Sequence, residues 1–313
     1  MRAGCARVDG AVPKDHAVSR RLTGADGGIR SPSGEALLVN GADDREVPGS
    51  REMMGPVSAV PAAVPREARP VQREWQDLAK TTARPPGFEQ AMIATLPAPA
   101  RRWLAHAIVP GTPLWQVVRL TMRGQIRLGQ WRPFTATQVL APPGGYIWAA
   151  TARFAGLPVT GYDRLSSGTG EMRWRMLRLI PVMTAAGPDI TRSAYGRLAG
   201  EIALIPTVFQ HATWADSEQP GTAAATWRFG EDTETAELRV GDDGQLLQVM
   251  VNRWGNPGGE PFGRWPFGVS VEAETGFGGV TIPSRFRAGW WWGTDRQAEG
   301  EFFRAHITAA QFA

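Results

Sequence analysis

The sequence has 313 residues, 42% of them hydrophobic, and its 34 basic and 30 acidic side chains give a formal net charge of +4. A balance so close to neutrality favours no nucleic-acid partner, because such partners usually require a clustered basic surface. The single cysteine, Cys5, excludes an intrachain disulfide. The longest apolar run, around residues 202–209, is far shorter than the roughly 18 residues of a transmembrane helix, so we expect no membrane span.

The first 74 residues contain no aromatic side chain, because all 13 Trp, 12 Phe and 3 Tyr lie from Trp75 onward. Aromatic side chains bury the most surface per residue, so this segment has little to offset the entropy of ordering. We therefore expect a disordered tail over residues 1–74 and a linker, with room for a short helix, over residues 75–99.

The N-terminus also bears on location. Residues 3–5 match the end of a lipoprotein cleavage site, but only four residues precede Cys5, too few for the apolar stretch of a secretory signal. The sequence as written predicts a cytoplasmic protein. Met53 and Met54 are alternative starts, and an envelope location stays open if the start codon is misassigned.

The first regular elements follow the linker. Leu104 and Ile108 are four residues apart, which predicts a short amphipathic helix over residues 101–108. From Val118 the apolar period becomes two, which predicts a half-buried strand over residues 118–128. Further strands are expected over residues 134–140, 145–154, 157–165 and 170–175. The short turns between them indicate an antiparallel meander.

A helical insert interrupts the strands at residues 190–205. Its apolar stripe recurs every four residues, at Ile190, Ala194, Leu198 and Ile202, and is expected to face the concave side of the sheet. Arg192, Arg197 and Glu201 are expected to stay in water. Strands then resume over residues 224–229, 235–240, 246–251, 268–274, 279–292 and 300–307.

Together these elements predict a mainly β fold of the α+β kind. We expect one domain over residues 100–313, built on a large curved antiparallel sheet or half-barrel of roughly ten strands. An N-terminal helix and a central helical plug complete it. So many strands exceed the usual size of a sheet, so the sheet must curl.

The order of elements resembles that of the bacterial outer-membrane lipoprotein carriers and related lipid-binding proteins. That resemblance implies a half-barrel plugged by helices, with a cavity for acyl chains, but it transfers no functional residue. Five separated motifs also resemble a bacterial family of unknown function, the DUF6544 family, which implies no activity. The motifs lie at residues 96–104, 187–193, 253–256, 277–285 and 289–304.

The first functional hypothesis is a non-catalytic, monomeric protein that binds a hydrophobic small molecule or lipid between sheet and helices. Its expected cavity lining is Leu120, Met122, Ile126, Leu198, Ile202, Ile282, Phe286 and Trp290. A second set of side chains, Arg119, Arg123, Arg285 and Arg287, suits an anion or a lipid headgroup. The alternative for these arginines is an ordinary solvated sheet face.

Two other classes stay open. A hydrolase or isomerase would pair His306 with Asp163, Asp295 or Glu301 at the sheet edge. An interaction scaffold would use an exposed face of Trp and Arg, with Trp291 pointing outward beside Arg287. The alternative for Trp291, which we favour, is that a loop or helix packs over its indole. The sequence lacks metal-ligand spacings and phosphate-loop motifs, so we expect no metal and no cofactor and assign no catalytic residue.

Overall fold

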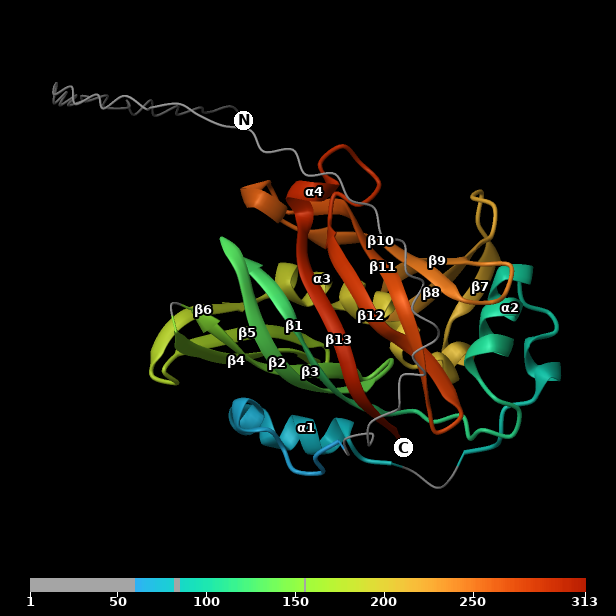
Figure 1. Cartoon of the computed structure of the whole chain (residues 1–313), viewed down its shortest axis with the longest axis horizontal. Helices are drawn as coiled ribbons and strands as arrows, with labels where there is room; N and C mark the ends of the chain where they lie inside the picture. Colours follow the sequence, from blue (N-terminus) through green and yellow to red (C-terminus); the bar gives the residue numbers. More distant parts are fainter. Residues whose placement is uncertain (1–59, 82–84, 155) are drawn as a thin grey trace, which may run out of the picture. The chain divides into compact units, whose positions relative to one another are not determined.

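The computed structural model describes residues 60–81, 85–154 and 156–313. Within these residues thirteen strands form one sheet, in the order β6-β5-β4-β3-β2-β1-β13-β12-β11-β10-β9-β8-β7. All neighbouring strands are antiparallel. Figure 1 shows the curved sheet with helices on both of its faces. The predicted mainly β fold with a curved open sheet is confirmed, with thirteen strands where roughly ten were expected.

The first half of the sheet comprises β1 (Val118–Leu128), β2 (Gln130–Ala141), β3 (Gly145–Phe154), β4 (Leu157–Ser166), β5 (Thr169–Met176) and β6 (Ile180–Ala186). The second half comprises β7 (Thr213–Asp216), β8 (Thr222–Phe229), β9 (Asp232–Val240), β10 (Leu246–Gly255), β11 (Gly263–Phe277), β12 (Val280–Trp290) and β13 (Glu301–Phe312). Strands β6 and β7 were not predicted.

The path of the chain explains the central helical insert. Six strands run outward from β1 to the edge strand β6, and seven more run from the other edge strand, β7, back to β13. Strand β13 then pairs with β1, so the two halves join in the middle. The chain must cross from one edge to the other, and it does so through α3 (Pro188–Gly200), η3 (Glu201–Leu204) and η4 (Pro206–His211).

The crossing lies on the concave face, where α3 packs mainly against β10, β5 and β9. The stripe behaves largely as predicted, because Ala194, Leu198 and Ile202 are buried in the main hydrophobic core. The predicted helix over residues 101–108 is also present, as α2 (Ala98–Ala107), and it buries Trp103 and Leu104 in the same core.

The convex face carries a second, smaller core. Helix α1 (Gln72–Leu78) follows the 3-10 turn η1 (Arg66–Val71), and Trp75 is buried there among Val139, Ile147 and Tyr162. Packing is therefore present within the segment expected to be a disordered tail, so the predicted boundary at residue 74 is too late. A single tryptophan with a few small apolar neighbours is enough to hold this segment. The prediction for residues 1–59 lies outside the described residues.

The Trp290–Trp292 triplet differs from its prediction as one continuous strand. Strand β12 ends at Trp290, and Trp291 turns the chain with a positive φ of 52°. Trp291 is buried, with the Arg296 guanidinium 3.7 Å from its ring centroid, and Trp292 packs directly over Gly268. The expected outward Trp291 of an interaction scaffold is therefore wrong, because the turn folds the indole back under Arg296.

Candidate functional site

A cavity of about 390 Å³ lies between the concave face and the insert. The cavity lies at the end of the sheet where β1, β10 and β12 finish, and we call this the hollow end. The opposite end, at which β1 and β12 begin, is the solid end. Most of the wall is apolar or aromatic. Its strand residues include Met122, Ile126, Trp148, Val249, Phe267, Val269, Val271, Phe286, Ala288, Trp290 and Phe303.

Small residues on α3 let the helix approach the sheet closely beside the cavity. Ser193, Gly196 and Gly200 all line the cavity, and they lie on the side of the helix that faces β10. A Cβ atom at Gly196 would come 2.9 Å from Cγ of Arg253, so only glycine lets this strand residue approach the helix so closely. The helix therefore packs closely against β10 and covers the cavity at the hollow end.

The structure divides the eight predicted lining residues into two groups. Four of them line the cavity: Met122, Ile126, Phe286 and Trp290. The other four are almost fully buried in the main core and do not line it: Leu120, Leu198, Ile202 and Ile282. Alternation along a strand identifies the face that a residue occupies, but not how far along the strand the cavity begins.

A polar network crosses the cavity wall, and its centre is Arg197 on α3. Its Nε donates to Glu201 Oε1 at 2.7 Å, and one Nη donates to Asp163 Oδ2 at 3.3 Å. Trp174 Nε1 donates to the other oxygen of Asp163 at 2.8 Å, and Gln138 Nε2 donates to the other oxygen of Glu201 at 2.6 Å. All four carboxylate oxygens therefore have a donor.

This network corrects the prediction that Arg197 and Glu201 stay in water. Their side chains are only 19% and 16% exposed, and the Arg197 guanidinium lies 4.4 Å from the ring centroid of Tyr146. Residues 194, 197, 198, 201 and 202 share one helix face in the i, i+3, i+4 pattern, so these two charges belong to the inward stripe. The third expected wet residue, Arg192, stacks on Trp254 at 4.0 Å.

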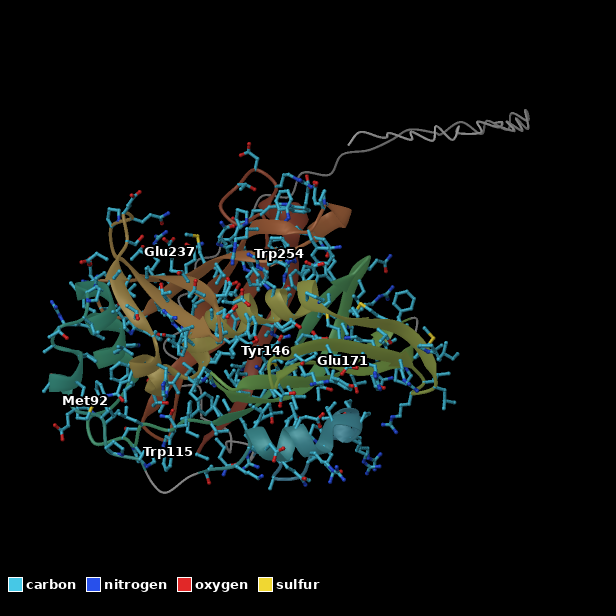
Figure 2. All side chains as sticks on the ribbon, turned by 180° about the vertical axis from the view of Figure 1, so that it is seen from behind. Met92, Trp115, Tyr146, Glu171, Glu237 and Trp254 are labelled. Atoms are coloured by element: carbon cyan, nitrogen blue, oxygen red, sulfur yellow. The ribbon has the colours of Figure 1, made fainter. Side chains whose placement is uncertain are left out.

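The burial of this network affects proton binding. Burial raises the pKa of Asp163, although Arg197 and the indole of Trp174 oppose that shift. Burial would lower the pKa of Arg197, but Glu201, Tyr146 and Asp163 raise it above its ordinary value. Burial also raises the pKa of Tyr146, which Figure 2 shows in the middle of the molecule, to about 12.

Arg253 on β10 is a charged group of the cavity wall whose two Nη atoms are both spare donors within the described residues. Its Nε donates to the backbone oxygen of Ser193 at 3.0 Å, and its guanidinium lies over the adjoining rings of Phe267 and Trp290, 4.9 and 5.1 Å from their centroids. Among the described residues, no acceptor meets its two Nη atoms. Burial lowers the pKa of Arg253 to about 10, so the side chain is still charged at neutral pH.

The start of α3 is fixed near the rim of the cavity. Trp254 Nε1 donates to Asp189 Oδ1 at 2.9 Å, and the Trp254 ring carries the stacked Arg192. Figure 2 shows Trp254 above Tyr146 in that view. Beyond it, Pro257 and the exposed Phe262 complete the cavity wall.

The predicted anion-contact arginines lie on the convex face, away from the cavity. Arg119 donates to Gln311 Oε1 at 2.7 Å, and Arg287 forms an ion pair with Glu272 at 2.7 Å. Arg123 and Arg285 sit opposite His306 on either side of β13. Three of the four, all except Arg119, border a second hollow of about 710 Å³ on this face. Their binding of an anion stays a prediction.

The predicted acid–histidine pair does not form. Burial, together with Arg123 and Arg285, lowers the pKa of His306, and no carboxylate in the described part of the chain reaches its ring. Of its expected partners, Asp163 belongs to the concave network, and Glu301 pairs with Arg304 at 2.7 Å. His106 does contact Glu274 at 2.9 Å, but this pair lines neither hollow.

None of the helices in the described ranges has both the length and the hydropathy needed to cross a bilayer. In the same ranges, no group of three or more His, Cys, Asp or Glu side chains is arranged to hold a metal ion.

Several solved structures are similar to this chain. A domain assigned to outer membrane lipoprotein sorting, from Vibrio parahaemolyticus, is 10% identical, with 63% of this chain and 86% of that chain covered and a TM-score of 0.34. A DUF1329 family protein from Desulfovibrio piger is 9% identical, with 63% and 86% covered and a TM-score of 0.35. A LolA superfamily protein from Nitrosomonas europaea is 8% identical, with 63% and 85% covered and a TM-score of 0.34.

No curated protein matches the chain. A family profile does match, over residues 86–302, which is more than half of the chain and includes nearly all of the five motifs and the whole wall of the cavity up to Phe302. The resemblance expected from those motifs is confirmed, and the chain belongs to the DUF6544 family, a family of unknown function.

Proposed function

We propose that this protein binds a hydrophobic acyl or lipid-like molecule in the cavity between the sheet and α3, without catalysis and as a monomer. The observation that carries the proposal is the cavity itself, whose volume of about 390 Å³ falls within the roughly 300–1,000 Å³ typical of small-molecule sites. Its wall is mostly apolar and aromatic, with a few polar groups at fixed positions, which is the usual composition of such a site.

Arg253 identifies the polar end of the ligand. The carboxylates of Asp163 and Glu201 are already fully hydrogen-bonded, whereas Arg253 keeps two Nη groups free beside the aromatic rings of Phe267 and Trp290. A guanidinium pairs best with a carboxylate or another oxygen-rich group. The ligand is therefore an acyl chain whose carboxylate or ester oxygens accept from Arg253, with its methylenes in the apolar part of the cavity.

The binding test compares two fluorescent probes on the full chain. N-phenylnaphthylamine is uncharged, and a dansyl-labelled fatty acid carries the proposed head. Val269→Trp fills the cavity from β11, and Ser270→Trp is its matched control, because the next residue of the same strand points to the opposite face. We expect the native chain and Ser270→Trp to bind both probes, and Val269→Trp to bind neither. Equal binding by all three proteins would contradict the proposal.

The identity of the head is tested with Arg253→Gln. Loss of a charged hydrogen bond costs roughly 1.5–3 kcal/mol, so we expect the fatty acid to bind about ten- to a hundredfold more weakly. The uncharged probe should bind as it does to the native chain. Because each buried methylene adds about 0.8 kcal/mol, affinity for unlabelled fatty acids should also rise with chain length until the cavity is full. Equal losses for both probes would show that Arg253 only shapes the cavity.

A further inference from the structure

Exposed apolar side chains are unevenly distributed over the molecule. Eleven large ones are exposed among the described residues, and nine of these lie at the hollow end or on the edge strand β6. The nine are Leu128, Phe154, Leu157, Leu177, Leu179, Ile180, Val182, Met183 and Phe262. Only Val109 and Leu247 lie at the solid end. Scattered single residues of this kind are normal on a protein surface, but a concentration at one end marks an interaction site.

Most of the nine belong to two hairpin tips that adjoin each other. Phe154 pairs with Leu157 at the tip between β3 and β4, and Met176 pairs with Ile180 at the tip between β5 and β6. The backbone N–H of Leu177 donates to the oxygen of Pro158 at 2.9 Å, which joins the two tips. Figure 1 shows the β5–β6 hairpin projecting at the edge of the sheet. We call residues 153–154 with 156–157, and residues 175–183, the paired tips.

The paired tips are basic as well as apolar. Arg153, Arg175 and Arg178 are all exposed, and neither segment contains an acidic residue. The nearest carboxylate on β5 belongs to Glu171, which is occupied by ion pairs with Arg164 and Arg173, each at 2.9 Å. Leu179, at 77% exposed, is the least covered large apolar residue of the group. Apolar side chains interleaved with unneutralised arginines are typical of segments that enter the interface of an anionic bilayer.

The alternative occupant of an apolar edge strand is a strand from another protein chain. Pro181 lies within β6 and has no N–H to donate to an added strand. Proline and basic side chains on an edge are the common means by which proteins prevent such pairing. The side chains of β6 are also exposed on both of its faces, which suits insertion into a fluid apolar layer better than addition to a sheet.

We propose that the paired tips dock this protein onto the surface of a bilayer that contains anionic lipids. Leu177, Leu179 and Ile180 enter the boundary of the acyl chains, and Arg175 and Arg178 contact the headgroups. The tips lie at the same end of the sheet as the cavity, so docking brings the cavity close to the membrane. The docking itself depends only on surface residues and is independent of whether the cavity holds a ligand.

The test is flotation of the full chain with vesicles of phosphatidylcholine alone or of an equal mixture with phosphatidylglycerol. We expect the native chain to float with the mixed vesicles and much less with the neutral ones. The double variant Leu177→Ser, Leu179→Ser should bind the mixed vesicles at least about tenfold more weakly. Arg175→Gln with Arg178→Gln should lose roughly thirtyfold on the same vesicles, because each arginine near an anionic surface contributes about one kcal/mol.

The matched control is Val109→Ser with Leu247→Ser, which removes the two exposed apolar side chains of the solid end. It should float as the native chain does, and so should the filled-cavity variant Val269→Trp, which separates docking from ligand binding. Absence of native binding to the mixed vesicles, or an equal loss in the control, would overturn the proposal. Light scattering that shows self-association through the tips, without vesicle binding, would overturn it in favour of a second copy of this chain.

Discussion

The solid end and the hollow end are built from the same strands and the same insert, yet one is a packed core and the other holds a cavity. Along β1, Leu120 is packed whereas Met122 and Ile126 line the cavity. Along β12, Ile282 is packed whereas Phe286 and Trp290 line it. The difference therefore does not come from the strands, whose inward rows are apolar throughout.

The difference comes from what faces the sheet. At the solid end the concave face is covered by large side chains, including Trp103 and Leu104 of α2 and Phe209 of η4. At the hollow end it is covered by α3, which presents Ser193, Gly196 and Gly200. Closely packed interiors are the rule in proteins, so the space left between α3 and the sheet indicates a use for that space.

The largest effect should come from the polar network at the border between the two ends. Arg197→Met removes the cation that touches both Asp163 and Glu201, and leaves two largely buried carboxylates without their ion-pair partner. We expect a loss of about 3–5 kcal/mol in the free energy of unfolding, measured by chemical denaturation at neutral pH. Arg228→Met is the control, because Arg228 is exposed on β8 and should change stability by no more than about 0.5 kcal/mol. Equal losses of stability in the two variants would mean that the polar network does not stabilise the fold.

The next prediction compares the two ends directly with two aliphatic truncations. Leu198 is 1% exposed and packed, whereas Ile126 is half-buried on the cavity wall. Leu198→Ala leaves a new void and should cost about 2–5 kcal/mol, whereas Ile126→Ala enlarges an existing space and should cost roughly 1 kcal/mol. Thermal unfolding with and without a saturating fatty acid measures both. The loss of thermal stability in Leu198→Ala, relative to the native chain, should be the same with and without the ligand. If the ligand restores the stability of Leu198→Ala, the ligand occupies a space at Leu198 and not the proposed cavity.

Sequence periodicity and turn residues predicted most of the strands. Strands β1 and β3 match their expected bounds, because apolar and polar residues alternate or strong turn residues flank them. Strand β6 was missed because Ile180, Val182 and Met183 do not alternate with polar residues, and both faces of that strand are exposed. Strand β7 has only four residues, Thr213–Asp216, too few for a periodic signal. Pairing with a neighbour, rather than any local pattern, makes these two segments strands.

The candidate site was predicted in kind but only partly in position. Met122, Ile126, Phe286 and Trp290 lie on the cavity wall because strand alternation identifies the inward face. Arg253 was not predicted, since it sits on a strand that the periodicity ended at residue 251, while β10 continues to Gly255. Arg197 and Glu201 could have been found from the i, i+3, i+4 spacing with Ala194, Leu198 and Ile202. The boundary between packed core and cavity depends on tertiary packing and has no signal in one sequence.

The last expected effect is confined to alkaline pH and is a pH dependence of stability that arises from Tyr146, which is buried beside the polar network. Burial raises the pKa of its phenol from 10.0 to about 12, so between these pH values the unfolded chain loses the proton while the folded chain keeps it. The folded state then binds more protons, and stability falls as the pH rises through this window, by about 2–3 kcal/mol in total. Arg253 acts in the opposite direction over the same range, because burial lowers its pKa to about 10.

The informative quantity is therefore the difference in the free energy of unfolding between the native chain and Tyr146→Phe, measured by chemical denaturation from pH 8 to pH 12. That difference should change by about 2–3 kcal/mol in favour of the variant as the pH rises, because Phe has no proton to lose. A constant difference would mean that the Tyr146 hydroxyl reaches water through the cavity.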